Sequence, residues 1–122
     1  MARLNDQCRE AIERADEIIS TPGLDAVYVG PSDLSVSMGL APSYDQGAPE
    51  FVAAIERVVE CCNRHGVVAG VHAGTPEVAR KRISQGFRFV QMCDDAGSLV
   101  RGAAVALAEL KVPAGAGPDT AA

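Results

Sequence analysis

The sequence contains no tryptophan, and aromatic residues make up only 4% of it. An aromatic surface on which nucleic-acid bases could stack is therefore disfavoured. Basic residues are also scarce, with 11 lysines and arginines against 16 acidic residues and a net charge of −5. This balance has the wrong sign for binding phosphate backbones or anionic membranes, so we expect no nucleic-acid partner and no membrane partner.

Long apolar runs are missing as well. None approaches the roughly 20 residues that span a bilayer, and the opening residues, MARLNDQCRE, contain no apolar secretory signal. The cysteines show no CxxC spacing, and His65 and His72 do not supply the pattern of ligand pairs that a zinc site needs. We expect reduced, mostly buried thiols in a cytoplasmic protein. The cysteines are Cys8, Cys61, Cys62 and Cys93.

The apolar residues that are present suffice for one core. Hydrophobic residues make up 48% of a chain of 122 residues, a length that suits a single domain. We expect this domain to cover residues 1–111. The remaining residues, 112–122, read VPAGAGPDTAA and have nothing to pack, so a disordered tail is predicted.

Helical and strand patterns alternate along the expected domain. Apolar residues recur at helical spacing in segments that we predict to be helices: 8–19, 49–64, 75–86 and 94–110. Short β-branched runs predict buried strands: 25–29, 67–71 and 87–92. A short helical turn capped by Ser32 or Asp33 should reach Met38 and lead into a surface loop. The inner positions expected for the last helix are Leu99, Val100, Ala103, Ala104, Leu107 and Leu110.

This order of elements predicts an α/β fold with three parallel strands and covering helices. Periodicity alone leaves two architectures open, an open flavodoxin-like sheet and a part of a (β/α)8 TIM barrel. A whole barrel needs about 250 residues, and the chain has 122. A barrel would therefore be partial.

In parallel α/β folds, ligands bind beyond the carboxyl ends of the strands. The first predicted strand is followed by Gly30, Pro31, Ser32 and Asp33. The glycine lets backbone approach a ligand closely, and the start of a short helix can receive a carboxylate. Asp33 is a suitable oxygen ligand for Mg²⁺ or Mn²⁺, although the same residue could only cap the helix.

Other polar residues at strand ends have structural alternatives. His72 follows the second predicted strand and could be an acid, a base or a ligand, but an isolated histidine is more often a rim or substrate contact. Thr75 could bind an anion or simply cap a helix, and Asp94 and Asp95 also look like caps. The basic run 80–82 is expected to be a solvated helix face.

A longer stretch resembles a known family. The residues LDAVYVGPSDLS from Leu24 to Ser35, followed by Met38 and Gly39, are similar to the signature of the HpcH/HpaI aldolases, which are related to the citrate lyase β subunit. GVH from Gly70, TPE from Thr75 and QGFRFV from Gln85 continue the resemblance. It implies strands six to eight of a (β/α)8 barrel, a C-terminal half-barrel.

The resemblance also implies a chemistry. In this family a divalent metal, Mg²⁺ or Mn²⁺, chelates pyruvate and stabilises the enolate that forms when a hydroxy-2-oxo acid is cleaved to pyruvate and an aldehyde. By resemblance, Asp33 is a metal ligand, and Gly30, Ser32 and Asp33 contact the 2-oxo acid. Gln7 stands where the family has a metal-binding glutamate, a degenerate ligand position.

The family's catalytic histidine and arginine belong to the first half of the barrel, so no catalytic residue is assigned in this chain. We expect a truncated or incomplete class II aldolase, a carbon–carbon lyase that acts on a small 2-oxo acid. It would associate as a homo-oligomer or with a complementing half-barrel, because an incomplete barrel exposes strand edges. The alternative is a noncatalytic remnant or binding module of the same fold.

Overall fold

The computed structural model describes residues 2–6 and 9–110 of the chain. Gln7, Cys8 and the expected tail over 112–122 lie outside the described residues. The chain divides into two compact units, residues 1–92 and residues 93–122.

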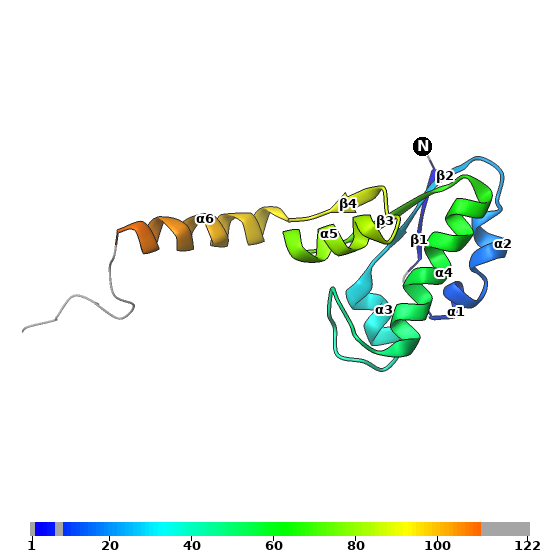
Figure 1. The fold of residues 1–122 in the computed structure, drawn as a ribbon, viewed down its shortest axis with the longest axis horizontal. Coiled ribbons are helices and arrows are strands. Elements are labelled where there is room, and N and C mark those ends of the chain that lie inside the picture. Colours follow the sequence, from blue (N-terminus) through cyan, green and yellow to red (C-terminus); the bar gives the residue numbers. More distant parts are fainter. Residues whose placement is uncertain (1, 7–8, 111–122) are drawn as a thin grey trace, which may run out of the picture. The chain divides into compact units, whose positions relative to one another are not determined.

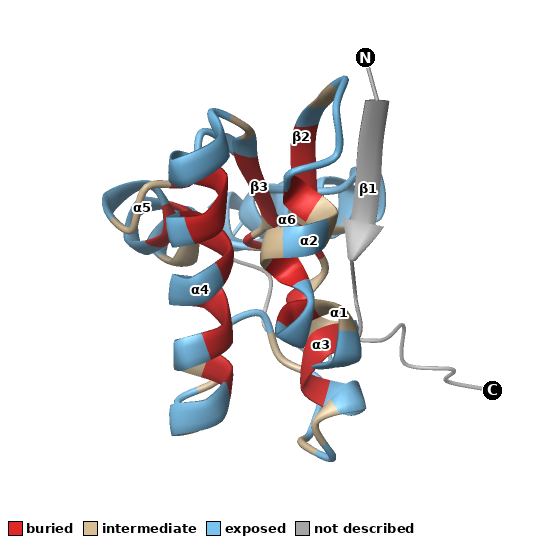
Figure 2. Cartoon of the chain, turned by 90° about the vertical axis from the view of Figure 1, so that its right-hand side faces the viewer, coloured by how far each residue is buried: buried red, intermediate tan, exposed pale blue. Residues whose placement is uncertain are grey.

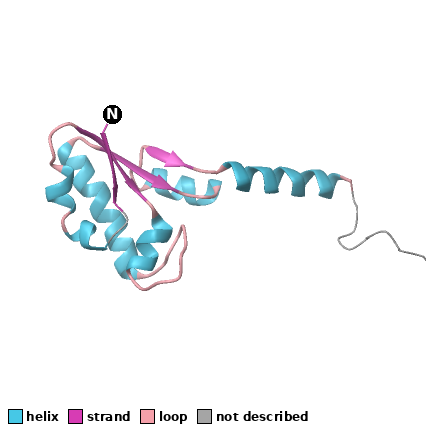
Figure 3. Cartoon of the chain, turned by 180° about the vertical axis from the view of Figure 1, so that it is seen from behind, coloured by secondary structure: helices cyan, strands magenta, loops and turns pink. Residues whose placement is uncertain are grey.

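The first unit is built on a parallel sheet whose strands, among the described residues, follow the order β1-β2-β3-β4 (Figures 1 and 3). The strands are β1 (Ala2–Asp6), β2 (Leu24–Val29), β3 (Val68–His72) and β4 (Phe89–Gln91). The three predicted strands are confirmed, and β1 is an addition. A flavodoxin-like sheet doubles back in its strand order, so the sequential order makes that alternative wrong.

Helices connect these strands and build a core against the sheet. They are α1 (Arg9–Glu13), α2 (Ala15–Ile19), α3 (Pro31–Ser37), α4 (Pro49–His65) and α5 (Pro76–Ser84). Figure 2 shows buried residues on β2, on β3 and along one side of α4. Val27, Val29 and Val71 point to this core together with Phe51 and Ile55 of α4. Because side chains alternate along a strand, the opposite face of the sheet carries Tyr28, His72 and Gln91.

Helix α4 illustrates why these elements form where they do. It begins at Pro49, whose fixed φ suits the first helical position, and it ends before Gly66 with φ of 69°. This left-handed conformation is one that glycine adopts without strain. Apolar residues at helical spacing bury one side of the helix against the sheet.

The expected single helix over residues 8–19 is wrong in one respect, because the segment forms two short helices, α1 and α2. Arg14 lies between them with φ −98° and ψ 14°. The side chain of Arg57 on α4 donates to the carbonyl oxygens of Ile12 at 2.9 Å and Glu13 at 3.2 Å. These bonds satisfy carbonyl groups that a continuous helix would have used internally.

The second unit contains α6 (Asp95–Glu109), which begins at Asp94 as predicted, since the Asp94 carboxylate accepts from the Gly97 amide at 2.6 Å. The inner positions expected for this helix are wrong, because none of its residues is buried and Leu99 is 75% exposed. Residues 93–110 contain no second helix or strand against which it could pack. Neither α6 nor any other helix in the described ranges is long and apolar enough to cross a membrane.

The expectation of buried thiols is confirmed only in part. Cys61 and Cys62 are free and buried, as expected, whereas Cys93 is free and exposed. Burial, followed by the neighbouring Cys61, raises the pKa of Cys62 to about 11. The Cys62 thiol is therefore protonated at neutral pH and acts as a small core residue.

Candidate active site

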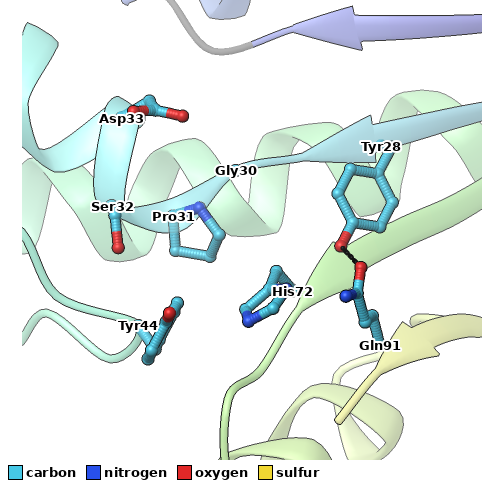
Figure 4. Close-up of a pocket in the computed structure, with 8 residues that line it drawn as sticks. All are labelled: Tyr28, Gly30, Pro31, Ser32, Asp33, Tyr44, His72 and Gln91. Atoms are coloured by element: carbon cyan, nitrogen blue, oxygen red, sulfur yellow. Dashed lines mark hydrogen bonds between the residues drawn. The ribbon is translucent and has the colours of Figure 1, made fainter. Parts of the chain in front are cut away.

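A pocket of about 290 Å³ lies at the carboxyl ends of β2, β3 and β4 in the first unit. Figure 4 shows the side chains that line it: Tyr28, Gly30, Pro31, Ser32, Asp33, Tyr44, His72 and Gln91. The predicted substrate contacts Gly30, Ser32 and Asp33 are thus brought together, and His72 joins them. This is the edge of a parallel sheet at which ligands bind in α/β proteins.

One wall of the pocket is the turn from β2 into α3. Gly30 is the residue before the helix, with φ −96° and ψ 97°, and Pro31 occupies the first helical position. The Gly30 carbonyl oxygen accepts from the Leu34 amide at 2.9 Å, and the Ser35 hydroxyl donates to the Pro31 carbonyl oxygen at 2.7 Å. Proline at this position is preorganised for a helix, so the backbone holds Ser32 and Asp33 at the pocket.

Asp33 does not cap the helix. Gly30 is the N-cap residue and no side chain makes the capping bond, so the expected capping by Ser32 or Asp33 is wrong. Asp33 is exposed and sits in the first turn of α3, where a carboxylate is stabilised by the helix dipole. With the capping role removed, its carboxylate is available to a ligand in the pocket.

The described residues supply one ligand for a hard cation at this wall, the Asp33 carboxylate. No group of three or more histidine, cysteine or acidic residues comes together in the described ranges. The second predicted ligand position, Gln7, lies outside those ranges. Carboxylate oxygens are what Mg²⁺ and Mn²⁺ prefer, so Asp33 fits as a single ligand and a complete site requires further donors.

The other wall comes from the ends of β3 and β4 and from the loop after α3. His72 and Gln91 are register partners, and the Tyr28 hydroxyl donates to the Gln91 side-chain oxygen at 2.9 Å. The Tyr44 ring lies over the His72 ring with centroids 4.7 Å apart. Burial, with a smaller effect of Tyr44, raises the pKa of Tyr28, so its hydroxyl remains a donor at neutral pH.

Three residues of this wall were not found from the sequence: Tyr28, Tyr44 and Gln91. The alternation of side chains along the strands could have placed Tyr28 and Gln91 beside His72. Tyr44 lies in an aperiodic loop and gives no comparable signal. Thr75 does not line the pocket; its hydroxyl accepts from the Val78 amide at 3.3 Å, so its role as a helix cap is confirmed.

The expected solvated face over residues 80–82 is wrong for Arg82, which is only 2% exposed. Its guanidinium donates to the Tyr44 carbonyl oxygen at 2.9 Å, the Asp45 carboxylate at 3.1 Å and the Gln85 side chain at 2.9 Å. Burial lowers the pKa of Arg82 and the Asp45 carboxylate opposes that shift. A buried cation needs such partners; the loop supplies Tyr44 and Asp45, and Gln85 at the end of α5 supplies the third.

Comparison with known proteins identifies relatives of this chain. The family model HpcH/HpaI aldolase/citrate lyase matches residues 7–102. The chain is 35% identical over 105 residues to a hydroxypyruvate/pyruvate aldolase of Rhizorhabdus wittichii, covering 86% of the chain and 42% of that protein. It is 35% identical over 98 residues to a 2-keto-3-deoxy-L-rhamnonate aldolase of Klebsiella pneumoniae, covering 74% of the chain and 36% of that protein.

Solved structures agree with the sequence comparison. A crystal structure of a HpcH/HpaI aldolase/citrate lyase family protein from Burkholderia cenocepacia superposes with a TM-score of 0.84 at 29% identity, covering 90% of this chain and 42% of that one. The chain thus spans about two-fifths of the length of such relatives, and its fold is part of their TIM barrel. On this evidence the chain belongs to the HpcH/HpaI aldolase/citrate lyase family.

Proposed function

We propose that this chain carries the 2-oxo-acid-binding part of a metal-dependent aldolase, which cleaves a hydroxy-2-oxo acid to pyruvate and an aldehyde. The observation that supports it most is that Asp33, in the first turn of α3, lines the pocket. Its carboxylate does not cap the helix, so a capping role does not explain its place there. Relatives named aldolases support the reaction class.

Each residue of the β2–α3 turn has a role in this proposal. Asp33 supplies a carboxylate ligand for Mg²⁺ or Mn²⁺, and Gln7 would supply a weaker, neutral oxygen. Ser32 and the backbone at Gly30 contact the carboxylate of the 2-oxo acid. When bound, the cation would stabilise the negative charge that develops on the keto oxygen as the carbon–carbon bond breaks.

A base and further ligands would come from outside the described residues. The outer strands β1 and β4 offer backbone edges for such an addition, since a sheet edge presents unpaired donors and acceptors to another chain. We propose that a second copy or a complementing half-barrel pairs there in a reducing cytoplasm, where free thiols such as Cys93 persist.

The test is release of pyruvate from a 4-hydroxy-2-oxo acid in the presence of Mn²⁺. It is run on the chain alone and on the chain co-expressed with the part of the R. wittichii aldolase that precedes the matched region. Asp33→Asn should abolish Mn²⁺ binding, measured by calorimetry, and lower pyruvate release by at least about 100-fold. Glu77→Gln removes an exposed charge on α5 and should change neither.

The replacement of the family's glutamate by Gln7 favours a second candidate, a noncatalytic binding module of the same fold. In that case the chain would bind a 2-oxo acid without releasing pyruvate, with or without the complementing part. Absence of both Mn²⁺ binding and turnover in the complemented protein would contradict the aldolase proposal.

A further inference from the structure

The wall opposite Asp33 has the properties of a second ligand-binding surface. Nε2 of His72 is buried and has no hydrogen-bond partner among the described residues. A buried polar atom without a partner is unfavourable, and such atoms in native proteins call for a specific explanation. Since His72 lines the pocket, a ligand atom reaching this wall would satisfy it.

The ring of His72 is held by Tyr44. The two ring centroids lie 4.7 Å apart and the ring planes are tilted by 33°, within the distance range of aromatic contacts. Figure 4 shows Tyr44 on one side of His72 and Gln91 on the other. Tyr44 itself fits against Gly74, where an added Cβ would come within 2.5 Å of the Tyr44 ring. A side chain at position 74 would therefore displace Tyr44.

An ion pair between the buried Arg82 and the exposed Asp45 fixes this loop on α5. The Tyr44 carbonyl oxygen and the Asp45 carboxylate both accept from Arg82, at 2.9 and 3.1 Å, and Lys81 donates to Asp45 at 2.7 Å. The guanidinium of Arg82 also lies 5.8 Å from the centre of the Phe51 ring, a cation–π contact with the core. The Tyr44 ring is thus positioned by the core although it belongs to a loop.

The side chains opposite Asp33 favour one kind of functional group in a ligand. Among the described residues that line the pocket, Asp33 is the only acidic side chain and no lysine or arginine is present. Opposite Asp33 stand the His72 imidazole, the Tyr28 phenol and the Gln91 carboxamide, and the Tyr28 hydroxyl already donates to Gln91. Such groups both donate and accept hydrogen bonds. They suit an alcohol, whereas a second carboxylate would be left without a cation.

We propose that His72, with the Tyr28–Gln91 pair, binds the hydroxylated end of a 2-oxo acid, and that Tyr44 is the positioning residue of the His72 ring. The proposal rests on the proposed function, because it assumes that the 2-oxo acid end lies at Asp33. It makes this wall the part of the site that distinguishes a polyhydroxylated substrate from a dicarboxylic one.

The test compares the dissociation constants of two ligands for the chain co-expressed with the complementing part of the barrel, measured by calorimetry in the presence of Mg²⁺. Pyruvate probes the Asp33 wall alone, and a 4,5-dihydroxy-2-oxo acid probes both walls. Removing one ligand hydrogen bond with His72→Leu should weaken the dihydroxy ligand about tenfold and change pyruvate binding less than about twofold. His72→Gln, which keeps a donor and an acceptor, should restore part of the loss.

The matched control is His65→Gln on α4, whose imidazole contacts Asp16 outside the pocket. Tyr44→Ala should reproduce the selective loss of His72→Leu, and Tyr44→Phe, which keeps the ring, should bind as the unsubstituted chain does. A merely structural role of Tyr44 would weaken both ligands equally.

Equal loss of both ligands in His72→Leu, or no loss of either, would overturn the proposal while leaving the proposed function standing. Preference of the unsubstituted chain for a dicarboxylic 2-oxo acid over the dihydroxy acid would also overturn it. If the complemented protein without substitutions binds neither pyruvate nor the dihydroxy acid, the proposed function fails and this inference fails with it.

Discussion

The two walls of the pocket are positioned in different ways. The β2–α3 wall is one continuous segment, in which Pro31 and a backbone hydrogen bond between Gly30 and Leu34 hold Ser32 and Asp33 in place. The His72 wall is assembled from the ends of two strands and a loop. Its positioning depends on side-chain contacts, above all those of Arg82 with Tyr44 and Asp45.

This difference indicates which wall can change its shape while the fold stays the same. A turn defined by proline and a helix start keeps its shape whatever its neighbours are. A wall held by the hydrogen bonds of Arg82 and by a ring contact can be released by a single substitution at a residue that does not line the pocket. The expected chemistry follows the same division, with the shared 2-oxo acid at the first wall and the variable part of the substrate at the second.

The largest expected effect comes from removing the buried guanidinium of Arg82. Arg82→Met removes the hydrogen bonds to the Tyr44 carbonyl oxygen, the Asp45 carboxylate and the Gln85 side chain, and at about 1 kcal/mol for each bond it should destabilise the chain by about 3 kcal/mol. The free energy of unfolding in urea measures this loss. Arg80→Met on the same helix is the control, because Arg80 is exposed. Equal unfolding midpoints for the two variants would show that Arg82 does not hold the His72 wall.

A second prediction concerns the core of the first unit, to which Cys62 belongs. The pKa of Cys62 is raised to about 11 from an unfolded value near 9.0, so the folded state favours the neutral thiol. This contribution is fully present below pH 9.0 and is lost as the pH rises through about 11. The loss should be about 2 kcal/mol and should affect both walls together.

Urea unfolding below pH 9.0 and near pH 11 measures the effect. Cys62→Ala lacks the titrating group and should lose correspondingly less stability over the same interval, which separates Cys62 from the other groups that ionise there. The same pH dependence in both proteins would contradict the assignment.

The substitution with the smallest expected effect on stability, Gly74→Ala, tests whether the two walls are positioned independently. Gly74→Ala places a Cβ on a residue with φ of 70° and against the Tyr44 ring, and should cost about 1.5 kcal/mol. The β2–α3 wall does not depend on this contact, so amide chemical shifts should change at His72 and Tyr44 and not at Ser32. Gly47→Ala, with no atom within 4 Å of the added Cβ, is the control. Changes of equal size at both walls would mean that they are not independent.

Much of the first unit could be predicted from the sequence because its signals are local. Gly66 ends α4 and Thr75 begins α5, and each acts through its own backbone or hydroxyl. Strand β1 was missed because the residues ARLND show neither alternation nor β-branched enrichment. The burial of α6 was predicted wrongly. Apolar residues at helical spacing show which face of a helix can be buried, but they do not show which element packs against that face.

The site shows the same limit. Gly30, Ser32 and Asp33 lie close together in the sequence, so their meeting at the pocket could be predicted. The capping role expected of Ser32 or Asp33 could be ruled out only from the backbone geometry, which makes Gly30 the N-cap residue. Arg82 was predicted to be part of a solvated basic run. Its partners Tyr44 and Asp45 are far from it in the sequence, so the neighbouring residues give no sign of these contacts. Long-range contacts of this kind are a property of the fold.

The central claim is that both walls bind one hydroxy-2-oxo acid. Amide chemical shifts of the isotope-labelled chain, bound to the complementing part of the barrel and followed while a 4,5-dihydroxy-2-oxo acid is added in the presence of Mg²⁺, test it. We expect shifts at Ser32 and Asp33 and at His72 and Gln91 that saturate at the same ligand concentration. Shifts at one wall only, or at neither, would contradict it.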